Sequence, residues 1–97
     1  GAYESVTGIE AVNQAANLTV SPNPGNGLFG LKLTGAINGV YETQVFDATG
    51  KMIYSYHIEN TSSLLLHTFD LQNQPKGIYT LKLINNNKVL THKVVKL

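Results

Sequence analysis

Apolar and polar residues alternate with a period of two along most of the chain from Leu18 onward. In residues 78–84 the three odd positions carry tyrosine or leucine, and threonine and lysine lie between them. This period is typical of a strand that buries one face. No window keeps helical spacing with capping residues over three turns. The pattern therefore predicts an all-β domain.

Glycine, proline, asparagine and aspartate separate the apolar runs and predict where the strands end. The two prolines of Pro22-Asn23-Pro24 lack backbone donors and end the first run. Residues 47–50, which begin with aspartate and end with glycine, suit a tight hairpin loop. Strands are expected at residues 17–21, 28–34, 40–46, 51–58, 64–69, 78–84 and 88–96.

Seven short strands are too many for one open sheet and favour two packed layers. The polar segment 72–77 is long enough to carry the chain from one sheet to the other. We therefore predict a seven-stranded antiparallel immunoglobulin-like β-sandwich, without the Cys-Trp-Cys core of antibody domains. The strands at 40–46 and 51–58 carry large apolar residues on both faces, which leaves their inward faces undecided.

Residues 1–16 differ from the rest because they show no sustained hydrophobic period. They are interpreted as a flexible linker, and residues 17–97 as one domain. The chain begins at Gly1 without a methionine or a basic and apolar leader. It is therefore expected to be an excised piece whose targeting context lies elsewhere.

Composition narrows the function classes further. Seven lysines, with no arginine, oppose six acidic residues, so the net charge of +1 gives no basic field for nucleic acid. No apolar run approaches the roughly 18 residues of a membrane span. The absence of cysteine excludes thiol catalysis, disulfides and thiolate metal sites.

The remaining polar residues do not predict a catalytic or metal site. His57, His67 and His92 lie in three different predicted strands without ligand-like spacing, so neither a metal nor a cofactor is expected. Asp47 and Asp70 each follow a strand aromatic and are interpreted as turn caps. No serine lies in a glycine-flanked nucleophile elbow. The domain is therefore not expected to be an enzyme.

Three tyrosines suggest an alternative function. Tyr54 and Tyr56 share one strand face, and Tyr41 is expected nearby on the adjacent strand, an arrangement that could stack on sugar rings. Cross-strand tyrosines more often stabilise a sheet, and tryptophan is absent. An accessory module that binds surface carbohydrate is the second hypothesis, and an inert spacer is the third.

Four segments together resemble the type A C-terminal sorting domain of the type IX (Por) secretion system of Bacteroidota. In chain order they are residues 18–24, residues 45–51, residues 69–71 with 75–79, and residues 92–97. Each motif alone is weak, but four in register, the last one closing the sequence, are specific. The resemblance covers residues 17–97 and marks ten signal residues: Pro22, Asn23, Pro24, Gly77, Tyr79, Lys93, Val94, Val95, Lys96 and Leu97.

The resemblance implies that the domain follows a passenger protein that is brought to the periplasm. The outer-membrane translocon and its shuttle protein would recognise the folded domain, and a sortase-like peptidase would remove it at the cell surface. The passenger would then be attached to lipopolysaccharide or released. Cleavage is expected within residues 7–16, because a peptidase needs accessible, extended backbone. Members of the family often carry arginine where this chain has Lys51 or Lys82, so bidentate guanidinium contacts are not expected there.

The strand at 88–96 closes the sequence and is expected to leave a sheet edge open. A receptor strand could pair with such an edge, and weak self-association is expected for the same reason. Deletion of residues 93–97 is then expected to block export while much of the domain still folds.

Overall fold

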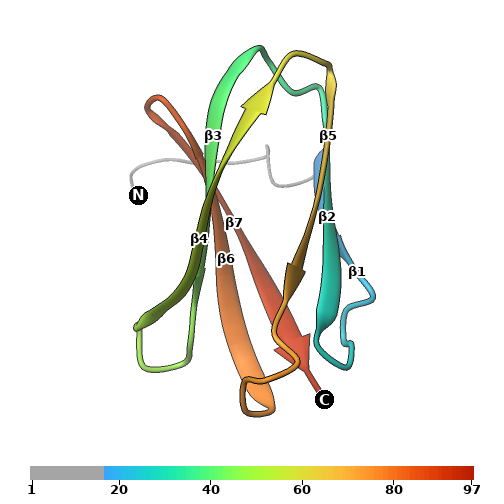
Figure 1. The fold of residues 1–97 in the computed structure, drawn as a ribbon, viewed down its shortest axis with the longest axis vertical. Helices are drawn as coiled ribbons and strands as arrows, with labels where there is room; N and C mark the ends of the chain where they lie inside the picture. Colours follow the sequence, from blue (N-terminus) through green and yellow to red (C-terminus); the bar gives the residue numbers. More distant parts are fainter. Residues whose placement is uncertain (1–16) are drawn as a thin grey trace, which may run out of the picture.

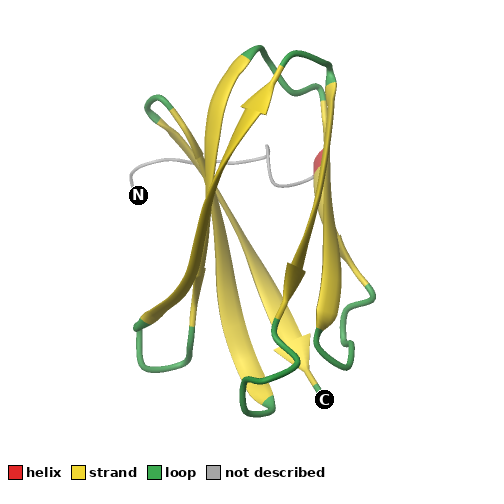
Figure 2. Ribbon diagram, in the orientation of Figure 1, coloured by secondary structure: helices red, strands yellow, loops and turns green. Residues whose placement is uncertain are grey.

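The computed structural model describes residues 17–97 as strands joined by loops (Figures 1 and 2). The strands are β1 (Leu18–Ser21), β2 (Leu28–Thr34), β3 (Gly39–Phe46), β4 (Met52–Asn60), β5 (Leu64–Asp70), β6 (Gly77–Asn85) and β7 (Lys88–Lys96). Every predicted strand is present, with ends that differ by one or two residues at most. Within this part of the chain, no helix has the length and apolar character needed to span a bilayer. The linker predicted at residues 1–16 lies outside the described residues.

The strands form two antiparallel sheets that face each other. One sheet has the order β1-β2-β5, and the other has the order β4-β3-β6-β7. The segment between β5 and β6 carries the chain from the first sheet to the second, as its length predicts. The prediction of an all-β, two-layer sandwich of the immunoglobulin-like type is confirmed.

The hydrophobic core fills the space between the sheets because alternate residues of each strand point inward. Phe29 of β2 and Phe69 of β5 are register partners whose stacked rings have centroids 5.6 Å apart. The most deeply buried apolar side chains are Leu18, Phe29, Leu31, Val45, Leu65, Phe69, Leu71, Leu81, Leu83 and Val94.

The inward face of β3 is the one that carries Tyr41, Thr43 and Val45. The register of β3 with β4 shifts between Val45 and Phe46, and Ile53 is the extra residue of this β-bulge. Ile53 and its neighbour Tyr54 therefore both pack against the core. This irregularity explains why β4 carries large apolar residues at both parities.

The connections gather at two ends of the sandwich (Figure 1). One end, called the motif end, contains the β1–β2 loop, the β3–β4 hairpin, the β5–β6 segment and the last residues of β7. The opposite end contains the β2–β3, β4–β5 and β6–β7 connections. Each of the four segments that carry the family resemblance reaches the motif end.

Candidate functional site

Residues that the resemblance marks as signal residues are far apart in the sequence but lie side by side at the motif end (Figure 1). Pro22-Asn23-Pro24 follows β1, and residues 93–96 complete β7. In the ladder between β6 and β7, Gly77 is paired with Lys96 and Tyr79 with Val94. The fold thus brings the first, third and fourth motifs together around the end of β7.

The Asn23 side chain binds the free edge of β7. Its Nδ2 group donates a hydrogen bond to the Lys93 carbonyl at 2.8 Å, and its Oδ1 atom accepts one from the Val95 amide at 2.9 Å. A primary amide has two N–H donors and a carbonyl acceptor, and here Asn23 uses one donor and the acceptor, the same pair of groups that a backbone peptide presents. Asn23 therefore acts towards β7 as a residue of a neighbouring strand would.

Gly25 continues this pairing with its backbone. The Gly25 amide donates to the Val95 carbonyl at 3.0 Å, and the Leu97 amide donates to the Gly25 carbonyl at 2.8 Å. The result is a short parallel bridge between Gly25 and Lys96. Residues 23–25, called the clip, thus pair the Lys93 carbonyl, both backbone groups of Val95 and the Leu97 amide.

The position of Gly25 admits no side chain. A Cβ atom there would lie 2.6 Å from the Pro22 carbonyl oxygen and 2.9 Å from a ring carbon of Phe29. Both distances are shorter than van der Waals contact, so only glycine lets the clip approach β7 this closely. Gly25 and Gly27 are both buried, so the turn at residues 25–27 is packed into the sandwich.

Lys96 and Gly27 tie the β5–β6 segment to the same structure. The Lys96 Nζ atom donates to the carbonyls of Gln72 at 3.3 Å and Gln74 at 2.5 Å. The Leu71 amide donates to the Gly27 carbonyl at 2.6 Å. Together with the clip, these contacts join the β1–β2 loop, the β5–β6 segment and the end of β7 into one hydrogen-bonded unit.

Tyr79 anchors the start of β6. Its ring is buried, and its hydroxyl donates a hydrogen bond to the Pro75 carbonyl four residues upstream. This geometry is that of the tyrosine corner found in immunoglobulin-like sandwiches. Burial raises the pKa of Tyr79, and the nearby Asp47 carboxylate acts in the same direction. The Gly-x-Tyr motif therefore has a structural role of its own.

The model of one protein family, described as the secretion system C-terminal sorting domain, matches residues 19–97. The chain belongs to this family. The sorting domain is a C-terminal signal for type IX secretion, and a signal of this kind is not a catalyst. Its function implies interaction with the type IX machinery and secretion through the outer membrane, to the cell surface or beyond it. No curated protein matches the chain significantly.

The turn aspartates of the sorting domain have structural partners. Asp47 Oδ1 accepts hydrogen bonds from the Thr49 hydroxyl at 2.6 Å, the Thr49 amide at 2.9 Å and the Lys51 amide at 3.0 Å. These bonds, that of the Thr49 hydroxyl above all, lower the pKa of Asp47. Asp70 Oδ1 accepts a bond from the Gln72 amide at 2.8 Å. The interpretation of both aspartates as turn caps is confirmed.

β7 is an edge strand of its sheet, as expected, but the last part of its edge is not open. The clip occupies the edge of β7 from the Lys93 carbonyl to the Leu97 amide. A receptor strand or a second copy cannot pair there while the clip is in place, because each of these groups already has a partner.

The deletion of residues 93–97 would also have a wider effect than the loss of a signal. It would remove the fully buried Val94 from the core and Lys96 from the β5–β6 segment. It would also leave Asn23 and Gly25 without their partners. Such a truncation cannot separate recognition from folding, so single substitutions are the better test.

The tyrosine platform predicted for carbohydrate binding is not formed as expected. Tyr41 is buried, because it shares the inward face of β3 with Val45, and its hydroxyl accepts a hydrogen bond from the Ile37 amide. The Tyr54 hydroxyl is hydrogen-bonded to His67 Nε2 at 2.7 Å. Of the three tyrosines only Tyr56 is exposed. The set therefore offers one accessible ring rather than a three-ring surface.

The three histidines lie apart, each with its own contacts. Burial lowers the pKa of His67, a residue of β5 whose ring contacts Tyr54 and Tyr56 of β4. His92 Nδ1 lies 2.8 Å from the Lys93 carbonyl, and His57 Nε2 lies 3.7 Å from the Glu42 carboxylate. Within residues 17–97, no three side chains of the metal-binding types lie close enough together to hold an ion.

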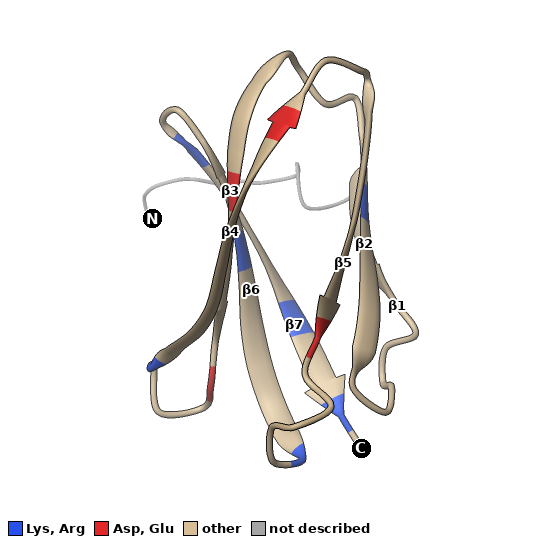
Figure 3. Cartoon of the chain, in the orientation of Figure 1, with Lys and Arg blue, Asp and Glu red and all other residues tan. Residues whose placement is uncertain are grey.

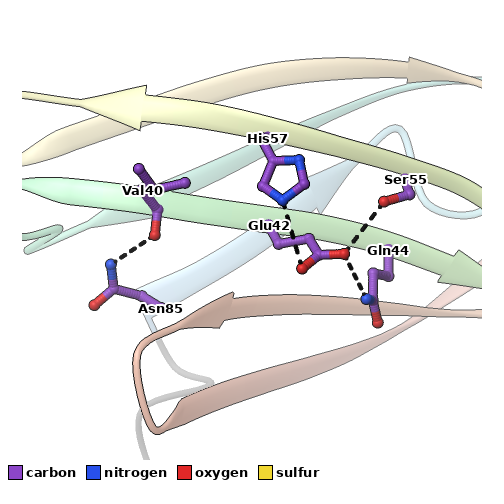
Figure 4. A network of polar contacts seen from close by, with 6 residues as sticks. All are labelled: Val40, Glu42, Gln44, Ser55, His57 and Asn85. Atoms are coloured by element: carbon purple, nitrogen blue, oxygen red, sulfur yellow. Dashed lines mark hydrogen bonds and ion pairs between the residues drawn. The ribbon is translucent and has the colours of Figure 1, made fainter.

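Glu42 is the centre of a polar network on the outer face of the four-stranded sheet (Figure 4). Its carboxylate accepts hydrogen bonds from Gln44 Nε2 at 2.7 Å and Ser55 Oγ at 3.3 Å, and His57 lies close to it. The bond from Gln44 contributes most to lowering the pKa of Glu42. Neighbouring side chains thus satisfy this carboxylate within the sheet.

Proposed function

We propose that this sorting domain is read as a folded address that takes an N-terminal passenger from the periplasm through the type IX outer-membrane translocon. A shuttle protein of that system would recognise the domain first. The observation that supports this most directly is the clip, because it joins the Pro-Asn-Pro motif to the terminal signal residues. Recognition would then depend on the clipped unit as a whole rather than on a linear peptide.

We further propose that a sortase-like peptidase removes the domain at the cell surface, within residues 7–16. The passenger is then attached to the surface or released. Asn17 precedes β1, and Pro22 follows that strand at the motif end. The chain therefore enters the sandwich at the other end of β1 from the motif end (Figure 1). This entry point supports a division in which the translocon reads the motif end and the peptidase acts on the chain that precedes β1.

The test is the export of a reporter with a Sec leader, fused to residues 1–97, in a host with a type IX system. Asn23→Ala removes both side-chain bonds to β7. Asn26→Ala is the matched control, because it changes an exposed asparagine of the same loop. The unaltered fusion and Asn26→Ala should release a shortened reporter outside the cell, whereas Asn23→Ala should leave most of it in the periplasm.

Thermal unfolding of each purified chain shows whether Asn23→Ala is still folded at the temperature of the export assay. Export of a folded Asn23→Ala variant at the level of the control would overturn the role of the clip. Retention of the unaltered fusion, in a host that exports a native sorting domain fused to the same reporter, would overturn the proposed export function.

A further inference from the structure

The clip restricts how a partner can read the end of β7. The backbone edge from Lys93 to Leu97 is already paired, Val94 is buried, and Lys96 Nζ is bound to loop carbonyls. The residues of β7 that flank Val94 have the opposite parity, so Lys93 and Val95 lie on the outer face of the four-stranded sheet. A partner that reads these two signal residues must therefore contact this face.

The register of the sheet defines the neighbours of these two residues. Val95 is paired with Ile78, and Lys93 with Thr80. Across β3 and β4, Thr80 is followed by Phe46 and then by Met52. This area, called the signal face, consists of Phe46, Met52, Ile78, Lys82, Lys93 and Val95, and Lys51 directly precedes Met52 in the chain.

The signal face combines an apolar centre with positive charge. Lys82 Nζ lies 5.0 Å from the centroid of the Phe46 ring, a cation–π contact that holds the ammonium group over the apolar surface. Lys51 and Lys93 add two exposed ammonium groups. The nearby Asp47 carboxylate accepts hydrogen bonds from Thr49 and the Lys51 amide, and its negative charge offsets part of the charge of Lys51.

The other half of the same sheet face carries the opposite charge. Glu42 and Glu59 lie there, on β3 and β4, away from the motif end (Figure 3). This half exposes apolar side chains to the same degree, since Val40 is 49% and Val89 54% exposed, against 48% for Met52 and 52% for Ile78. The two halves therefore differ in charge rather than in apolar exposure.

We infer that the signal face is a docking surface for a protein surface that has an apolar centre and a rim of carboxylates. The inference rests on the proposed function and assigns this surface to the type IX component that recognises the domain. The exposed Met52 and Ile78 and the half-buried Val95 supply the apolar contact, and the lysines orient the partner and exclude surfaces of their own charge.

The experiment places glutamate at matched positions on the two halves and measures export of the reporter fused to residues 1–97. Ile78→Glu and Met52→Glu should each lower export by about tenfold or more, the effect of roughly 1.4 kcal/mol of lost binding. Val89→Glu and Val40→Glu have equal exposure and should export at the unaltered level. Lys93→Glu should reduce export, whereas Lys88→Glu, an exposed lysine beside the opposite end, should not.

Thermal unfolding of the purified chains shows whether each variant is folded. Ile78→Ser and Met52→Ser remove the apolar surface without adding a charge. If a glutamate variant fails to fold, the corresponding serine variant should still show the loss of export. Equal export by all glutamate variants would overturn the inference of a docking surface. If the Asn23→Ala fusion stayed in the periplasm in the same assay, the proposed function would still stand. Sedimentation that shows a dimer of the unaltered chain, abolished by Ile78→Glu, would also overturn it, because the face would then belong to a second copy.

Discussion

The two sides of the sandwich where sheet edges meet are closed by different chemistry. On the side of β1 and β7, the clip uses the backbone of Gly25 and the uncharged amide of Asn23. On the side of β4 and β5, the contact is made by side chains. His67 is hydrogen-bonded to Tyr54, and its ring is stacked on that of Tyr56 with the ring centroids 5.0 Å apart.

The two sides of the sandwich are sensitive to different kinds of change. The clip contains no group that titrates, but it requires glycine at one position because the backbone approaches so closely. The contact of His67 with the two tyrosines has no position that requires glycine, but it depends on the protonation state of the imidazole. The side that carries the signal motifs is therefore sensitive to sterics, and the other side is sensitive to pH.

The largest effect is expected for Gly25→Ala. The new methyl group would overlap the Pro22 carbonyl and the Phe29 ring, so the free energy of unfolding should fall by about 1–3 kcal/mol. Chemical denaturation measures this loss. Gly30→Ala is the control, since a Cβ atom there meets its neighbours at 3.7 and 3.9 Å. Equal stabilities of the two variants would contradict the steric account of the clip.

A smaller effect is expected for Tyr54→Phe on the other side. The change removes the hydroxyl that is bonded to His67 and should lower the free energy of unfolding by about 0.5–1.5 kcal/mol. Tyr56→Phe alters an exposed ring and should leave the stability nearly unchanged. If Tyr56→Phe lowered the free energy of unfolding as much as Tyr54→Phe in the same denaturation assay, the Tyr54–His67 hydrogen bond would not be what joins β4 to β5.

The smallest effect is a pH dependence at His67. Burial lowers its pKa in the folded state from the ordinary value of 6.5, so below pH 6.5 the unfolded chain binds a proton that the folded chain resists. The free energy of unfolding should therefore fall as the pH drops below 6.5, until the folded-state pKa is passed. Denaturation as a function of pH should show this slope, and His67→Phe should abolish it. A titration of the imidazole by NMR with a midpoint at or above 6.5 would contradict the prediction.

The carboxylates of Glu42 and Asp47 titrate in a separate, lower pH range. The pKa values of Glu42 and Asp47 lie below their ordinary values of 4.5 and 3.8. Their stabilising contribution is therefore complete above those values and is lost only as the pH falls through the lowered ones. The change at His67 can thus be measured without interference from these two groups.

The strands were predictable from the sequence because each depends on local pattern. Alternation of apolar residues, punctuated by glycine, proline and asparagine, located all seven within one or two residues. The family resemblance also pointed to Asn23 as a signal residue. Its partners could not be predicted, because Lys93 and Val95 are 70 and 72 residues away and nothing local to Asn23 indicates them.

Two predictions failed for physical reasons. The burial of Tyr41 depends on which face of β3 points inward, and apolar residues at both parities, Val45 beside Phe46, left that choice open. The end of β7 was expected to be open because β7 is the last of the seven predicted strands, whereas a loop covers it. Both outcomes depend on tertiary packing and not on propensity.

The clip also has a consequence for the order of folding. It joins residues about seventy positions apart. The entropy lost in closing such a long loop opposes its formation. This cost falls once hairpins such as β3–β4 and β6–β7 have formed and hold the chain together. We therefore expect it to close late. During that interval the end of β7 is an unpaired strand edge, and neighbouring chains can associate through it. The time that the clip takes to close thus sets how long a newly made domain is exposed to aggregation.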